Sequence, residues 1–200
     1  MPALNAGERA PMESFEAVLD FWFGPLGSSG KQRPEWFRKD ARFDAEIRLR
    51  FGELHRAAAA RELEPWRASP QPMLALVVVL DQFSRNLYRG DARAFAQDAH
   101  ARECAAQALD RGDDLALLPV QRMFLYLPFE HSEDAADQDR GVDLMGMLDA
   151  FEETRGQVEW AGKHRAIVRR FGRFPHRNAA LGRPSTPAEV EFLAQPGSGF

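Results

Sequence analysis

Three stretches of this sequence place imidazole, carboxylate and guanidinium groups beside apolar residues, where such groups are suited to binding or catalysis. An imidazole near a carboxylate can transfer protons, and a guanidinium near an amide can hold a carboxylate or a phosphate. The candidate ligand-binding residues are Arg85, Asn86, Glu130, His131, His164, His176, Arg177 and Asn178. Their types and spacing alone assign none of them a catalytic role.

An apolar run leads directly into the first of these groups. Residues 73–80 are all apolar and are followed at once by Asp81, Arg85 and Asn86. Because unpaired charge is costly in a core, another part of the fold must meet Asp81 and Arg85. We predict that Arg85 pairs with Glu130, which follows a proline and an apolar stretch. That pair is either structural or, with His131, a working acid–base pair.

The other two groups also have a structural and a functional interpretation. His164 shares a helical face with Trp160, Ile167 and Phe171, so it is either a core histidine or part of a site. The turn at residues 176–178 is suited to hold a carboxylate or phosphate, and equally to hold the carbonyl ends of neighbouring helices. If Arg85 and Arg177 point into one cleft, one of them is left for a ligand anion.

Composition and missing motifs exclude several classes of function. The net charge of -4 argues against a general nucleic-acid binder. The lone cysteine, Cys104, and the absence of a signal peptide or a long apolar run predict a cytoplasmic protein with no membrane partner. Phosphate-loop, nucleophile-elbow and zinc-protease motifs are absent. Adjacent Glu130 and His131 rarely both aim inward, so we predict no metal site and no cofactor.

Helical periodicity runs through most of the chain, and we predict an all-α antiparallel bundle of about seven or eight helices. Val77–Val79 alone would suit a strand, but no second strand exists to pair with it. Pro128 should break or kink its helix, and Ser132 should cap the next, with Glu133 and Asp134 in its first turn. Residues 1–11 are predicted to be a disordered lead-in, and residues 12–200 a single domain. The predicted helices span 12–23, 40–62, 73–89, 92–111, 119–128, 133–153, 157–172 and 187–194.

Several short sequence motifs of this chain occur together in one known family. The motifs are Asp20-Phe-Trp-Phe-Gly, Leu80-Asp-Gln-Phe-Ser-Arg-Asn, Arg93-Ala-Phe, Phe124-Leu-Tyr-Leu-Pro-Phe-Glu-His-Ser-Glu-Asp, Lys163-His-Arg and Arg173-Phe-Pro-His-Arg-Asn. From about residue 18 to 200 the chain resembles the bacterial domain-of-unknown-function family numbered 924. The resemblance implies tetratricopeptide-like helical packing and carries no assigned reaction. It also implies a proline where Ser84 stands.

Three functional hypotheses follow. The leading one is a binding module whose internal polar pocket receives a small anion or the carboxylate of a peptide or protein partner. The second is a metal-independent hydrolase or lyase with His176 or His131 as base and Glu130 as its acid partner. The third is a purely structural polar core, with protein–protein recognition on the surface.

Overall fold

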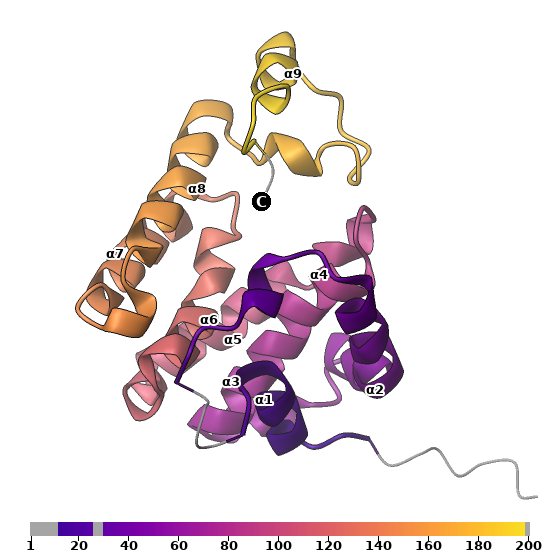
Figure 1. Ribbon diagram of the computed structural model, residues 1–200, viewed down its shortest axis with the longest axis vertical. Helices are drawn as coiled ribbons and strands as arrows, with labels where there is room; N and C mark the ends of the chain where they lie inside the picture. The colour runs from indigo at the N-terminus through magenta and orange to yellow at the C-terminus, as the bar shows by residue number, and fades with distance from the viewer. Residues whose placement is uncertain (1–11, 26–29, 199–200) are drawn as a thin grey trace, which may run out of the picture.

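The computed structural model describes residues 12–25 and 30–198, so the predicted disordered lead-in at residues 1–11 lies outside the described residues. The predicted all-α class is confirmed, since the described chain is helical and contains no strand (Figure 1). Short 3-10 turns connect several helices, and no described helix is both long and apolar enough to cross a lipid bilayer. The helices are α1 Phe15–Phe23, α2 Ala41–Ala59, α3 Pro70–Val77, α4 Ser84–Leu87, α5 Asp98–Asp110, α6 Pro119–Glu130, α7 Ala135–Leu148, α8 Gln157–Phe171 and α9 Pro187–Leu193.

The predicted central helix is confirmed, and it contains an irregularity. A π-helical segment, Val78–Phe83, joins α3 to α4, so the chain is helical from Pro70 to Leu87. Every residue from Met73 to Asp81 is fully buried, and α3 packs against α1, α5 and α6. A π-helical turn is wider than an α-helical one and changes the direction in which later side chains point. The segment therefore helps set the positions of Asp81 and Arg85.

Side chains cap several helices where the sequence predicts it, with one correction. Asp40 accepts hydrogen bonds from the backbone N–H groups of the first turn of α2. The predicted cap of α7 is wrong: Asp134 accepts from the backbone N–H groups of Ala136 and Asp137. Ser132 lies before that cap, where its hydroxyl donates to Asp137. A carboxylate two residues closer to the helix thus takes the role predicted for the hydroxyl.

Three predicted helices have different boundaries in the structure. The helix predicted at residues 133–153 ends at Leu148, and Glu152–Thr154 forms a separate 3-10 turn. Helix α6 is not broken at Pro128 and continues to Glu130, because only its last turn follows the proline and the N–H of His131 still bonds to the carbonyl of Leu127. The stretch predicted as one helix at residues 92–111 is divided into a 3-10 turn, Ala92–Ala94, and α5. Asp91 caps the short turn, so the predicted start signal acts on a different element.

Within the described residues, the buried apolar side chains form one large and one small cluster. The large cluster contains the central helix and the inner faces of α1, α2, α5, α6 and α7. The small cluster is formed by Ile167, Val168 and Phe174, with Phe171 and Phe192 packed against it. Figure 1 shows α7 and α8 side by side along one side of the molecule, with α9 beyond the end of α8. The C-terminal region therefore has a small core of its own.

Candidate functional site

The π-helical segment meets the C-terminal end of α6 at Asp81 and His131. His131 Nδ1 lies 2.8 Å from Asp81 Oδ1, and Arg85 Nη1 lies 3.0 Å from the same oxygen. Gln82 donates to the other carboxylate oxygen at 2.7 Å. Because a carboxylate with these donors accepts hydrogen bonds, the ring of His131 carries its proton on Nδ1, and Nε2 is the proton-accepting atom.

The surroundings of Asp81 and His131 favour an ionised carboxylate and a neutral imidazole. Burial acts to raise the pKa of Asp81, but Arg85 and His131 outweigh it and hold that pKa well below its usual range. Burial, then the positive charge of Arg85, lowers the pKa of His131, although Asp81 acts in the opposite direction. At neutral pH the pair is therefore a carboxylate beside a neutral imidazole.

Asp98, on α5, brings Arg85 and Arg177 together. Arg85 binds both of its oxygens, at 3.0 and 3.2 Å, and Arg177 Nη1 donates to Oδ2 at 3.1 Å. Asp98 is absent from the residues selected from the sequence. A signal was present, because Asp98, Ala101, Cys104 and Ala108 share the buried side of α5, and a carboxylate there needs a cation.

Arg177 is the most enclosed cation of the site. Its residue surface is 6% exposed, and its guanidinium lies 4.6 Å from the ring centroids of both Phe95 and Phe174. Nη2 donates to the carbonyl of His131 at 2.9 Å, whereas Nε is buried with no hydrogen-bond partner among the described residues. Burial, followed by the charge of Arg85, lowers the pKa of Arg177 to about 10. The surrounding carboxylates thus do not fully offset the cost of burying this charge.

The predicted Arg85–Glu130 pair is wrong, because Arg85 uses its donors on Asp81 and Asp98. Glu130 instead lies 3.3 Å from Nδ1 of His164, which also donates to the carbonyl of Trp160 at 2.9 Å. Burial, and then the charge of Asp81, raises the pKa of Glu130 to about 8. Burial, and then His131, lowers the pKa of His164 to about 3. Glu130 and His164 are therefore both uncharged near neutral pH.

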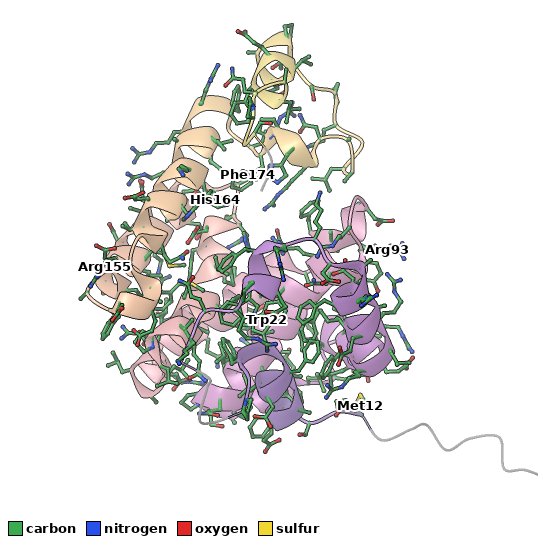
Figure 2. The ribbon with its side chains drawn as sticks, in the orientation of Figure 1. Met12, Trp22, Arg93, Arg155, His164 and Phe174 are labelled. Carbon is green, nitrogen blue, oxygen red and sulfur yellow. The ribbon has the colours of Figure 1, made fainter. Side chains whose placement is uncertain are left out.

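The rings of His131, His164 and Phe174 connect the end of α6 with the turn that carries His176. The ring centroids of His131 and His164 are 6.3 Å apart, and those of His164 and Phe174 are 5.7 Å apart. Figure 2 labels His164 and Phe174. Phe174 lies 5.5 Å from the ring of His176. Burial, and then Arg177, lowers the pKa of His176 to about 4. We call this connected set the polar centre, consisting of Asp81, Arg85, Asp98, Glu130, His131, His164, His176 and Arg177.

Two of the candidate residues lie outside the polar centre. Asn86 donates to Asp44 on α2 at 2.8 Å. Asn178 donates to Ser185 at 3.0 Å and accepts from Arg183 at 3.1 Å. Both amides join neighbouring segments of the chain. The structure thus brings together Arg85, Glu130, His131, His164, His176 and Arg177 from the residues selected in the sequence, and leaves the two asparagines apart.

Glu133 fastens the C-terminal turn to the rest of the molecule. Its carboxylate binds the guanidinium of Arg183 at 2.7 and 2.9 Å and accepts the backbone N–H of Phe174 at 2.8 Å. Glu133 precedes the cap of α7, so the predicted role of complementing the dipole from within the first turn is wrong. The turn that carries His176 and Arg177 is therefore attached largely through charged and polar contacts.

The described surface contains a groove away from this centre. It has a volume of about 640 Å³ and lies beside α1 and the start of α2, and none of its lining residues belongs to the polar centre. Access to the polar centre is through its partly exposed members, since the side chains of Arg85 and His131 are 20% and 14% exposed. Within residues 12–25 and 30–198, no group of three or more His, Cys, Asp or Glu is arranged to hold a metal ion.

Comparisons with other proteins identify a family and a similar solved structure. Residues 18–197 match the model of the family described as "Bacterial protein of unknown function (DUF924)". A solved structure of a protein of unknown function from Agrobacterium tumefaciens is similar, with 44% sequence identity and a TM-score of 0.79. The match covers 90% of this chain and 96% of the other. No match was found among curated proteins.

Proposed function

The chain belongs to the DUF924 family of bacterial proteins of unknown function, and for this member we propose a binding module whose polar centre receives a small anion. The ligand is a free carboxylate or phosphate, or the carboxylate of a peptide. We further propose that the chain acts in the cytoplasm and that its helices pack as in tetratricopeptide proteins. Short connections between neighbouring helices support that packing.

The observation that carries this proposal is the incomplete compensation of Arg177. Its guanidinium is enclosed by two phenyl rings, and its Nε lacks a partner among the described residues. A planar guanidinium binds carboxylate and phosphate oxygens with two parallel hydrogen bonds. A bound anion would offset the repulsion between Arg85 and Arg177, which lowers the pKa of Arg177. Ligand binding should therefore stabilise the fold.

The partly exposed edge of the centre offers a route for such a ligand. Arg85 and His131 retain solvent contact, while Asp81 is closed off. Arg85 already shares Asp98 with Arg177, so an anion that displaces or joins this carboxylate would contact both guanidinium groups. We propose a small ligand, because Arg177 is enclosed and only the edges of Arg85 and His131 keep contact with solvent.

Thermal unfolding in the presence of acetate, succinate or phosphate tests the proposal, with acetamide as the neutral counterpart of acetate. At about 100 times the Kd, a ligand adds about 2.7 kcal/mol, which raises Tm by several degrees in a chain of this size. We expect a rise in Tm that increases with anion concentration above the Kd in the wild type and in Arg169→Gln, which removes an exposed arginine of α8. We expect no rise beyond that seen with acetamide in Arg177→Gln, or in Arg85→Lys should the first variant fail to fold.

The outcomes separate the alternatives. A rise specific to the anions that survives in both Arg177→Gln and Arg85→Lys would place the ligand elsewhere. If no anion raises the Tm of the wild type more than acetamide does, the structural hypothesis holds, and the polar centre serves only to hold helices together. Calorimetric titration of succinate into the same variants checks that the thermal effect reflects binding and not a general effect of salt.

A further inference from the structure

We propose that the polar centre is also a catalytic site, in which His131 is the general base for hydrolysis of an ester whose acyl part carries a carboxylate. This inference rests on the proposed function, because the arginines that bind an anion would also hold that carboxylate. It assigns to Asp81 the role of positioning residue and to Nε2 of His131 the contact with the attacking water.

The position of the ring supports this assignment. Asp81 is fully buried and fixed at both oxygens, by Arg85 and Gln82, and it holds Nδ1 of His131 at 2.8 Å. No hydrogen bond joins Nε2 to another described residue, and the side chain of His131 is 14% exposed. A carboxylate that fixes the tautomer of a histidine and leaves its other nitrogen as proton acceptor is the arrangement general-base catalysis requires.

The chemical step needs only water as co-reactant. Nε2 of His131 takes a proton from water while the water oxygen forms a bond to the ester carbonyl carbon. The bond between that carbon and the alcohol oxygen then breaks, and the imidazolium returns its proton to the leaving oxygen. The products are a dicarboxylic acid and an alcohol. The carboxylate of Asp81 stabilises the transient positive charge on the ring.

The spacing of the groups indicates the class of substrate. Arg85 Nη1 and His131 Nδ1 both lie within 3.0 Å of one oxygen of Asp81, so guanidinium and imidazole are close neighbours. A substrate that reaches both must carry its carboxylate only a few bonds from the ester carbonyl. A half-ester of a short dicarboxylic acid meets this requirement, whereas a simple acetate ester has no group for the arginines.

Hydrolysis of mono-4-nitrophenyl succinate tests the step, with 4-nitrophenyl acetate as the uncharged control. We expect saturable hydrolysis of the succinate ester, and much slower hydrolysis of the acetate ester, by the wild type and Arg169→Gln. His131→Gln should lower kcat by at least about 100-fold while succinate still binds. Asp81→Asn should lower kcat and change the pH dependence of the rate, because an amide can no longer fix the tautomer.

Alkylation by bromoacetate provides an independent measurement on the same atom. Nε2 of His131 would displace bromide from the methylene carbon, and mass spectrometry of peptides would locate the carboxymethyl group. The neutral reagent bromoacetamide should react more slowly, because it lacks the charge that the arginines bind. Cys104 is buried, and burial raises the pKa of its thiol to about 12, so it should remain unmodified.

The two proposals fail in different ways. Succinate binding with neither ester hydrolysis nor alkylation of His131 would overturn the catalytic inference and leave the binding proposal intact. Alkylation of His131 without hydrolysis would show an accessible nitrogen and still overturn the catalytic step. Absence of anion binding would overturn both proposals. Equal hydrolysis rates in the wild type and His131→Gln would overturn the catalytic inference alone.

Discussion

Arg85 and Arg177, which are far apart in the sequence, donate to one carboxylate, that of Asp98. Without it, two guanidinium groups of like charge would face each other in a largely buried region. The central helix, α5 and the C-terminal turn are thus joined at a single side chain. Loss of its charge should affect all three elements.

Asp98→Asn should destabilise the protein by about 3–5 kcal/mol, because it removes the carboxylate that pairs with the enclosed Arg177 and leaves Arg85 with Asp81 alone. The matched control is Asp139→Asn, since Asp139 also binds two arginines, Arg165 and Arg169, but is 47% exposed. That substitution should cost less than about 1 kcal/mol. Urea denaturation measures both, and acetate should partly restore the first variant only. Equal losses in the two variants would contradict the prediction.

Stability should be greatest near pH 6.5. The folded-state pKa of Glu130, about 8, lies above its ordinary value of 4.5, so its contribution is lost as pH rises through 8. The pKa values of His55, His164 and His176 are lowered to about 4, 3 and 4, so stability also falls as pH drops below 6.5. Between pH 6.5 and 8 the slope due to Glu130 should approach about 1.4 kcal/mol per pH unit.

Glu130→Gln isolates the alkaline part of this profile. The amide does not titrate, so the decline between pH 6.5 and 8 should disappear while the acidic decline, caused by the histidines, remains. Denaturation at a series of pH values in wild type and variant gives the comparison. An unchanged alkaline slope in the variant would mean that Glu130 is already ionised in the folded protein.

Gly141 permits the close approach of α7 to the end of α6. A Cβ atom there would lie 3.3 Å from both the Cγ and the backbone nitrogen of Glu130. Gly141→Ala should therefore destabilise, because overpacking costs about 1–3 kcal/mol and exceeds the helix-propensity gain of about 1 kcal/mol. Gly162, within α8, has no atom within 4 Å of such a Cβ. Gly162→Ala should stabilise by about 0.5–1 kcal/mol, and a gain in both variants would refute the packing argument.

The buried side chain of His55 has one hydrogen-bond partner among the described residues, the hydroxyl of Ser84. Ser84 Oγ donates to the carbonyl of Leu80 and lies 2.7 Å from Nε2 of His55, whose Nδ1 has no partner among the described residues. Ser84→Ala should cost about 1–3 kcal/mol, because the imidazole loses its hydrogen bond inside the core. In the His55→Phe background the same change should be nearly neutral. A double-mutant cycle measures the difference, and additive effects would count against the pair.

Local signals in the sequence predicted the helices well, but they could not predict which polar groups pair. Asp40, Pro119 and Gly172 act within one turn of their own position, so their caps and helix ends could be read directly. The partner of Arg85 depends on how the chain turns between residues 78 and 83, and no local signal marks the π-helical segment there. Glu130 was therefore assigned to Arg85, although its partner is His164.

The polar centre was predicted in part for a similar reason. Glu130, His131 and Arg177 are flanked in the sequence by apolar residues, and this spacing indicates correctly that they are largely enclosed. The same reasoning could not separate these residues from Asn86 and Asn178, because a buried amide that joins two segments has the same surroundings in the sequence. Asp98 lies in an alanine-rich helix apart from the other polar residues of the centre, so its surroundings in the sequence do not mark it as part of a site.

The small apolar cluster around Phe174 has a consequence for motion. It contains far fewer buried side chains than the main cluster, and charged groups attach its turn to the rest of the molecule. Regions of this kind exchange amide hydrogens through sub-global opening, at a free energy below that of complete unfolding. The turn carrying Arg177 is expected to open in this way while the central helix stays protected. A ligand that meets Arg85 at the exposed edge would reach the enclosed Arg177 at a rate set by this local opening. A denaturant concentration too low to unfold the protein should then speed ligand binding.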